Sequence, residues 1–401
     1  MTAPQWALIS SSFVNRLGTG LFVTTSILYF TRIRHLDAQW VGLGLTIAGA
    51  VGLLSGIPVG HLADRHGPRM VTLTTLVVQA ATMAAFVLVR SWVMFTVLAT
   101  LDLLAASANN ASRGALIARV GGDNPAAFRS RLRSFVNLAI LLGSGGAIIV
   151  IQLDSTVAYT ALILVNAATY VIAALLLLRV PHYSAHPPVD QISPLSALRD
   201  RPYVAFAALN GALGFHYPIM TVLLPIWITV HTHAPPWTVA VAYLCNAALC
   251  IAFQVRLGSR VETVRDGGLA FRRAGLIFLV TCPLIALAAN LPAWAAMALL
   301  IAAVSLHSIG EVLHASAGFA LGFGLAPDHS QGQYQGMLGL GFDLGQAVAP
   351  AFLAFLCLGH GQAGWLVLAG LFGVLGVLGP PVAQWAGGRR PDPVVAEEAA
   401  A

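Results

Sequence analysis

Lysine is absent from this chain, and charge of either sign is scarce. All 21 basic residues among the 401 are arginine, only 9% of the residues are charged, and 58% are hydrophobic. A domain folded in water needs a charged exterior, which this composition does not supply, whereas a surface in contact with lipid needs none. Without lysine the chain has no G-x-x-x-x-G-K-[ST] nucleotide-binding motif. We therefore predict an integral membrane protein, not an enzyme, in which any pumping draws on an ion gradient.

Residue types that hold metals and cofactors are also few. The four cysteines all lie inside apolar stretches, where free thiols act as packing residues. The His-Thr-His run at 231–233 lies in a short connector without a carboxylate partner. The arginines are spread over the connectors rather than gathered on one face, which is a poor pattern for binding nucleic acid. We predict no metal, no cofactor and no nucleic-acid partner, and we expect a monomer.

Long apolar stretches recur along the whole chain. A bilayer core of about 30 Å requires about 20 apolar residues per helix, and twelve stretches reach this length. The sequence therefore predicts an all-α integral membrane protein with twelve transmembrane helices in two six-helix bundles. The predicted spans are 7–31, 40–62, 70–89, 93–117, 132–152, 156–178, 203–228, 237–257, 274–290, 293–322, 334–358 and 364–385.

Arginine placement predicts the orientation of these spans, because cytoplasmic connectors are enriched in basic residues. If the N-terminus is inside, the outer connectors hold only Arg32, Arg34 and Arg90. We predict a multi-pass protein of the cell inner (plasma) membrane with both termini in the cytoplasm. The inner connectors and the tail then hold sixteen arginines, which are Arg65, Arg69, Arg119, Arg129, Arg131, Arg133, Arg179, Arg199, Arg201, Arg256, Arg260, Arg265, Arg272, Arg273, Arg389 and Arg390.

One polar, proline-rich connector divides the spans six and six. It covers 181–201, between an N-terminal bundle at 1–180 and a C-terminal bundle at 202–386. We predict that it is a cytoplasmic linker and that a disordered cytoplasmic tail follows the second bundle at 387–401. The last part of the linker, SPLSALRDR at 193–201, is either a short amphipathic helix on the membrane surface or a flexible tether.

A shorter connector between the second and third spans, GHLADRHGPR, begins at Gly60. Gly60 permits close approach of another helix, and Gly67 permits a sharp turn. Asp64 can accept hydrogen bonds from a helix N-terminus or pair with an arginine, and such bonds can break when helices slide. The connector is either a gating latch that uses Asp64, Arg65 and Arg69 or a set of positive-inside anchors.

The pattern G-x-L-A-D-R-x-G-x-R in this connector resembles the loop signature of the major facilitator superfamily. Twelve spans in two halves, with both termini inside, are similar to that superfamily over nearly the whole chain. The resemblance implies a transporter in which the loop aspartate docks on the start of the eleventh helix, here around 334–336. It also implies that the loop arginine pairs with an acid after the fourth helix, here Asp123. Pro68 stands where the family more often has a basic residue.

A second stretch, from Gly310 to Gly336, narrows the resemblance. Its Gly-Glu pair, and its later Ala-Pro followed by Gln-Gly-Gln-Tyr-Gln-Gly, resemble the tenth-to-eleventh helix region of bacterial drug–proton antiporters. Gln331 stands where these antiporters often have a basic residue. The run LLGSGGA at 141–147 is only partly similar to their fifth-helix signature, since its Gly-Pro pair is absent. The resemblance implies proton-coupled efflux.

Ionisable residues inside a span are costly in lipid and usually face a cavity or a partner. Arg16 and Asp102 lie at matching depths in the first and fourth predicted spans, so we expect them to pair, either in a cavity or as a structural ion pair. Arg113 follows Asp102 by eleven residues, about three turns, and shares its face. Asn109 and Asn110 either add polar groups to the cavity or bond neighbouring helices.

The tenth predicted span carries a polar stripe. His307, Glu311 and His314 are spaced four and three apart, so they share one helix face, where a carboxylate and two imidazoles can exchange a proton during transport. Glu311 is the leading candidate for the protonation site. Asp343 in the eleventh span is either a second such site or a structural acceptor.

In the seventh span, His216 and Tyr217 stand beside Pro218. A proline inside a helix can kink or break it and free backbone carbonyls. We predict a gating bend at this point, with His216 and Tyr217 at the cavity.

Two transport functions compete on these residues. The favoured one is proton-coupled efflux of small, largely apolar compounds, such as a drug or a secondary metabolite, by alternating access. The alternative is a proton-coupled symporter that imports a small nutrient. A sugar importer should show more amides and aromatics in its cavity. Since the candidate cavity residues are largely charged or histidine, the sequence favours export.

Overall fold

The computed structural model describes residues 1–183 and 195–388, and all regular structure in these ranges is helical. The predicted linker at 181–201 is described only in part, and the predicted tail at 387–401 lies outside the described residues from position 389 onward. The end of the linker forms a four-residue helix, α8 (Ser196–Arg199), directly before the next long helix.

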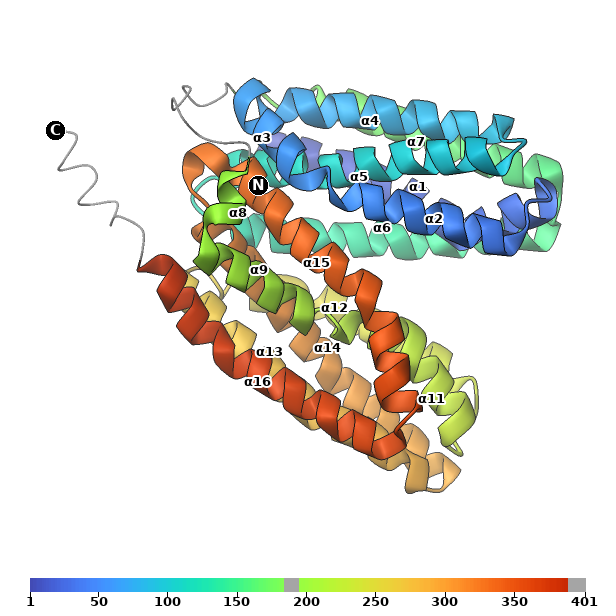
Figure 1. The fold of residues 1–401 in the computed structure, drawn as a ribbon, viewed down its shortest axis with the longest axis vertical. Helices are drawn as coiled ribbons and strands as arrows, with labels where there is room; N and C mark the ends of the chain where they lie inside the picture. The colour runs from blue at the N-terminus through green and yellow to red at the C-terminus, as the bar shows by residue number, and fades with distance from the viewer. Residues whose placement is uncertain (184–194, 389–401) are drawn as a thin grey trace. The chain divides into compact units, whose positions relative to one another are not determined.

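The chain forms two compact units (Figure 1). Unit 1 comprises Met1–Ser196 together with Ala326–Leu340, and unit 2 comprises Ala197–Leu325 together with Gly341–Ala401. One continuous helix, α15 (Gln331–Leu353), therefore begins in unit 1 and ends in unit 2.

Unit 1 is a helical bundle, and capping residues in the sequence mark the start of several of its helices. Its helices are α1 (Ala3–Leu28), α2 (Ala38–Leu53), α3 (Gly56–His66), α4 (Pro68–Ala85), α5 (Trp92–Val120), α6 (Pro125–Leu153) and α7 (Thr156–Leu177), with a π-helical turn at Tyr29–Ile33 and 3₁₀ turns at Phe86–Leu88 and Asp328–Ser330. Asp37, Ser91, Asn124 and Ser155 each accept a backbone amide at the start of a helix, which satisfies donors that the helix itself cannot. Helix α1 packs against α6 and α7, α2 against α5, and α4 against α5 and α7 (Figure 1).

Unit 2 is a second helical bundle. Its helices are α9 (Arg201–Leu213), α10 (His216–Pro218), α11 (Leu224–His231), α12 (Thr238–Gly258), α13 (Val264–Leu287), α14 (Ala293–Gly324) and α16 (Gly361–Gly387), with π-helical turns at Ile219–Leu223 and Ala354–Leu358 and a 3₁₀ turn at Ala288–Asn290. Helix α13 packs against α14 and α16, and α12 packs against α14.

The α-helix is interrupted near Pro218, while the predicted gating bend stays a prediction. Helix α9 ends at Leu213, and a π-helical turn follows Pro218 before α11 begins. A break of this kind frees backbone carbonyls, which need new donors when water is absent. The side-chain amide of Gln346 in α15 donates to the Gly214 carbonyl at 2.8 Å and so satisfies one of them.

Ten helical segments among the described residues are long and apolar enough to cross a membrane, and the pair α2–α3, bent by 45°, makes eleven. The remaining predicted span, 7–31, corresponds to α1, a helix of 26 residues that is not among these segments. Polar residues such as Arg16 lower its hydropathy, and its span stays a prediction. Large apolar side chains such as Leu54, Val157 and Trp294 are mostly exposed, as expected for surfaces that face lipid.

Candidate functional site

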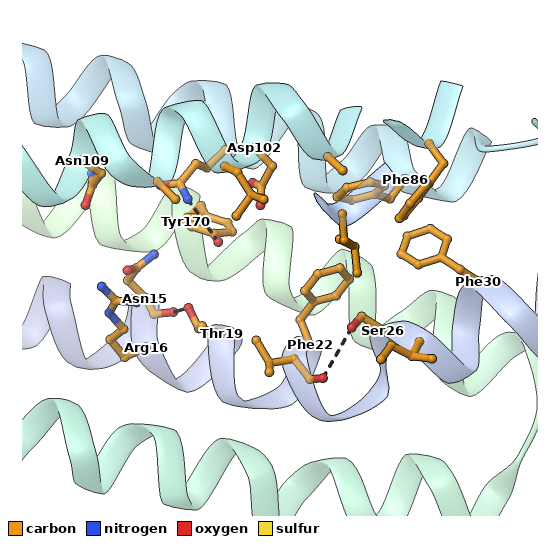
Figure 2. A pocket seen from close by; sticks show the side chains of 18 of the residues that line it. Asn15, Arg16, Thr19, Phe22, Ser26, Phe30, Phe86, Asp102, Asn109 and Tyr170 are labelled. Carbon is orange, nitrogen blue, oxygen red and sulfur yellow. Dashed lines mark hydrogen bonds between the residues drawn. The ribbon is translucent and has the colours of Figure 1, made fainter. Parts of the chain in front are cut away.

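Unit 1 contains a partly open cavity of ≈ 320 Å³. The lining positions on α1 recur every three or four residues, so one face of that helix forms a wall. Figure 2 shows Arg16 and Asn109 toward one end and the rings of Phe22, Phe30 and Phe86 toward the other. The lining residues are Asn15, Arg16, Thr19, Phe22, Val23, Ser26, Ile27, Phe30, Val41, Leu45, Gln79, Phe86, Phe95, Ala99, Asp102, Leu103, Ala106, Asn109, Asn110 and Tyr170.

The predicted pairing of Arg16 with Asp102 is wrong. Both line the cavity, but Arg16 Nη2 donates to Asn110 Oδ1 at 3.1 Å, and no ion pair joins Arg16 to Asp102. Asn110 stands eight residues beyond Asp102 on α5, about 12 Å along the axis, so this bond holds the guanidinium away from the carboxylate. Asp102 instead accepts the Thr82 hydroxyl at 3.3 Å.

Two further polar contacts stabilise the bundle beside the cavity. Arg113 is buried and donates from Nη1 to the Ser12 hydroxyl at 2.9 Å, so it lies behind the wall rather than among the lining residues. Asn109 lines the cavity and donates to the Thr75 hydroxyl at 2.8 Å, which ties α5 to α4. Asn109 therefore fits both alternatives from the sequence: it adds a polar group to the cavity, and it bonds a neighbouring helix.

The connector at 60–69 docks on the first turn of α15, within unit 1. Asp64 Oδ1 accepts the Gly332 amide at 2.8 Å, and Oδ2 accepts the Gln333 amide at 3.0 Å. Amides in a first helical turn have no intrahelical partner, and a carboxylate there is also favoured by the helix dipole. The contact precedes the 334–336 region that the resemblance implied, because α15 already begins at Gln331. Gly67 has φ 89°, which is the sharp turn that the sequence predicts.

The implied pairing of a loop arginine with Asp123 is wrong. Asp123 is exposed, and no ion pair joins it to any described residue. Arg69 Nη2 instead donates to the Leu178 carbonyl at 2.7 Å, where α7 has ended and its carbonyls lack helical partners. Arg65 is exposed and forms no ion pair in the part of the chain that the structure describes.

Beside the side-chain contacts of Asp64, helices α3 and α15 also approach closely through their backbones. A Cβ at Gly60 would lie 2.1 Å from the Gly332 carbonyl oxygen, and a Cβ at Gly332 would lie 2.4 Å from the Gly60 carbonyl oxygen. Gly56 and Gly336 face each other one turn away in the same manner. Small residues four apart are what permits such close packing of membrane helices.

We expect Gly60→Ala to destabilise the protein by about 1–3 kcal/mol, the usual cost of inserting volume into a packed contact. The measurement is thermal unfolding in lipid nanodiscs. Gly49→Ala in α2 is the matched control, because a Cβ there meets nothing within 4 Å. Equal unfolding temperatures for the two variants would contradict the close contact.

Unit 2 contains a buried histidine cluster. His216 Nε2 and His314 Nδ1 are 3.0 Å apart, and His314 Nε2 lies 3.2 Å from Asn210 Oδ1. The His307 ring is fully buried and lies 5.3 Å from the His216 ring and 4.8 Å from that of Phe278. An amide oxygen next to one imidazole nitrogen favours the N–H tautomer there, which leaves the other nitrogen to accept from His216.

Glu311 contacts a different helix. Asn246 Nδ2 of α12 donates to Glu311 Oε2 at 3.1 Å and also lies 2.9 Å from Ser308 Oγ. The predicted stripe on α14 thus contacts two sets of neighbours, α12 through Glu311 and the α9–α10 region through His314. Asp343 is half-buried, and no hydrogen bond or ion pair joins it to another described residue. The Tyr217 ring packs edge-on against Phe342 at 5.5 Å and lies, like His216, outside the cavity of unit 1.

Several side chains in these sites escaped the sequence analysis. Asn15, Gln79 and Tyr170 line the cavity, and Asn210 and Asn246 bond His314 and Glu311. Each is an uncharged polar residue within an apolar run. Charged and histidine residues stand out in an apolar run more than a single amide does, and four of these five residues are lone amides in predicted spans.

The sequence profile of the Major Facilitator Superfamily matches residues 8–350. The chain belongs to the Major Facilitator Superfamily. Among curated proteins, this major facilitator chain is 23% identical over 94 residues to YqjV, an uncharacterized MFS-type transporter of Bacillus subtilis (strain 168). That match spans 23% of each chain, about a quarter of the relative's length.

Solved structures resemble this major facilitator chain over almost its full length. A bacterial homologue of the iron transporter ferroportin, in an outward-facing state, gives a TM-score of 0.76 at 15% identity and covers 97% of this chain and 100% of its own. The human organic anion transporter MFSD10 (TETRAN) gives 0.64 at 16% identity, over 95% and 99% of the two chains. At these identities the likeness is one of fold. With the family match, it identifies a multi-pass membrane transporter of a family that is generally not enzymatic.

Proposed function

We propose that this major facilitator chain exports small, largely apolar compounds, such as a drug or a secondary metabolite, in exchange for protons by alternating access. The observation that carries the proposal is the cavity of unit 1, where the rings of Phe22, Phe30 and Phe86 adjoin a few polar groups. Small-molecule sites are typically apolar cavities with a small number of placed polar side chains. Arg16 and Asp102 supply charges that can orient a cargo.

Glu311 is the proposed proton site. Its carboxylate accepts a hydrogen bond from Asn246, and such a bond is strong because the acceptor is charged. Protonation removes that charge and weakens the link between α12 and α14, so binding a proton changes how firmly two helices of unit 2 are joined. His307, His314 and Asp343 are further candidates, and the His216–His314 pair offers a route for the proton.

Import by proton symport is the second candidate, and one observation favours it. The cavity is lined by four amides, Asn15, Gln79, Asn109 and Asn110, in addition to its aromatic rings. The sequence predicts a cavity made largely of charged and histidine side chains, whereas the lining residues include only two charged residues, Arg16 and Asp102, and no histidine. Amides and aromatics suit a nutrient with several hydroxyl or carbonyl groups.

We further propose that the protein resides in the plasma membrane with both termini in the cytoplasm, and that it acts as a monomer. The arginine bias of sixteen to three between the two sets of connectors supports this orientation. The docked connector at Asp64 is the proposed gating contact, with Gly60, Gly67 and Arg69 supporting its geometry.

The test is a substrate screen in proteoliposomes with an imposed pH gradient of each sign. Export coupled to protons predicts that a candidate compound moves against its concentration gradient only when protons flow in the opposite direction. Movement together with protons would assign the symport function instead. Transport of every tested compound at a rate independent of the gradient would contradict proton coupling.

A further inference from the structure

The polar end of the cavity in unit 1 carries uncompensated positive charge. Arg16 and Arg113 face each other between α1 and α5: Arg16 donates to Asn110, and Arg113 donates to Ser12. Ser12 and Arg16 are four residues apart on α1, and Asn110 and Arg113 are three apart on α5, so the guanidinium groups lie within about one helical turn of each other. No ion pair joins either group to a carboxylate of the described residues.

Hydrogen-bond donors at this end also lack acceptors. Arg113 is only 6% exposed, and its Nε and Nη2 atoms have no hydrogen-bond partner. Asn15, only 4% exposed, lines the cavity, and its Nδ2 has none either. Buried unpaired charges and donors are costly. Arg113 lies behind the wall of the cavity, so an anion there would accept a hydrogen bond from Asn15 Nδ2 and offset the charge of Arg113 without bonding to it.

The other end of the cavity suits an apolar tail. The Phe22 and Phe86 rings stack at 5.9 Å, and Phe30 packs on Phe86 at 5.2 Å. Phe22 follows Arg16 by six residues on α1, about 9 Å along the axis, which is the length of a two-ring hydrocarbon. Figure 2 shows this succession from Arg16 to Phe22 along one helix.

Asp102 does not balance these charges. It is a single carboxylate, it accepts the Thr82 hydroxyl, and it stands about 12 Å along α5 from the Asn110 that binds Arg16. A cationic cargo bound to Asp102 would be repelled by the two guanidinium groups of Arg16 and Arg113.

We propose that this cavity binds a small amphipathic organic anion, with its carboxylate-type head on Arg16 and Asn15 and its hydrocarbon tail among Phe22, Phe30 and Phe86. The claim that this anion is transported rests on the proposed function. The claim that it binds in the cavity does not.

The test is equilibrium binding by calorimetry, without any gradient, to the full-length protein in phosphatidylcholine nanodiscs. The probes share a biphenyl tail and differ in the head: biphenyl-4-ylacetate, its amide, and the corresponding amine. A charge-assisted head contact predicts that the carboxylate binds about tenfold tighter than the amide, or more. Arg16→Gln removes this preference, Arg16→Lys retains most of it, and Arg90→Gln, at an exposed arginine outside the cavity, leaves it unchanged.

Tighter binding of the amine, equal binding of all three probes, or no binding of any would overturn the proposal. A preference that survives Arg16→Gln in a variant with normal thermal unfolding would overturn the assignment of the head. Phosphatidylglycerol added to the nanodiscs separates two sources of the anion: unchanged affinity supports a soluble ligand, and lost affinity would show that a lipid head group occupies the site. Failure here leaves the proteoliposome test of proton-coupled transport unaffected.

Discussion

Glu311→Gln is expected to reduce proton-driven transport to the level of liposomes without protein. Glutamine keeps the size of the side chain and an oxygen that can accept from Asn246, but it cannot take up a proton. The link between α12 and α14 would then no longer depend on protonation. The measurement is uptake or efflux in proteoliposomes under an imposed pH gradient, alongside gradient-free counterflow, which should persist because it needs no net proton movement.

The matched control for this experiment is Glu262→Gln, which neutralises an exposed acid before α13. It should transport like the wild type. If Glu311→Gln retains gradient-driven transport, Glu311 is not the proton site, and the same assay on Asp343→Asn, His307→Gln and His314→Gln then tests the remaining candidates.

Asp64→Asn is expected to slow turnover about tenfold or more, because a hydrogen bond to a charged group contributes about 1.5–3 kcal/mol. An asparagine has one acceptor oxygen for two amides, and its own N–H groups would face the Gly332 or Gln333 N–H. If the contact must re-form in every cycle, the state that contains it becomes less populated and the cycle slows.

Hydrogen–deuterium exchange over the first turn of α15 reports this contact directly, and Asp64→Asn should accelerate it. Asp123→Asn, at an exposed acid without an ion pair, is the matched control and should change neither exchange nor turnover. If Asp64→Asn exchanges faster but turns over like the wild type, the Asp64 contact is not part of gating.

The helical class and most spans were predictable because lipid imposes a simple rule: about 20 apolar residues without charges mark one helix. The rule is weakest where a helix carries polar residues, as α1 does at Arg16, because they lower the hydropathy of the span. The interruption of the helix near Pro218 was predictable because proline removes a backbone donor. Its repair by Gln346 was not, since that contact joins α15 to residues far away in sequence.

Contacts between helices were predicted less well than the residues that make them. Asp64 was identified from its sequence surroundings, but the register of its contact depends on where α15 starts. Arg16 and Asp102 do line one cavity, but their matching depths in the predicted spans could not show that the Arg16 guanidinium would bond Asn110 instead. Lone amides such as Asn246 carry little sequence signal, because an amide within a span can bond a neighbouring helix as readily as a functional acid.

The glycine contact between α3 and α15 has a kinetic consequence. Interlocked side chains must change rotamer before two helices can part, whereas facing glycines have no rotamers to change. Separation at Gly60 and Gly332 therefore needs no change of rotamer at that point. The lifetime of the contact then depends on the hydrogen bonds beside it, two from backbone amides to Asp64 and one between Gln333 and His61. A chemical change to the Asp64 side chain alone can thus alter how long helices α3 and α15 stay in contact.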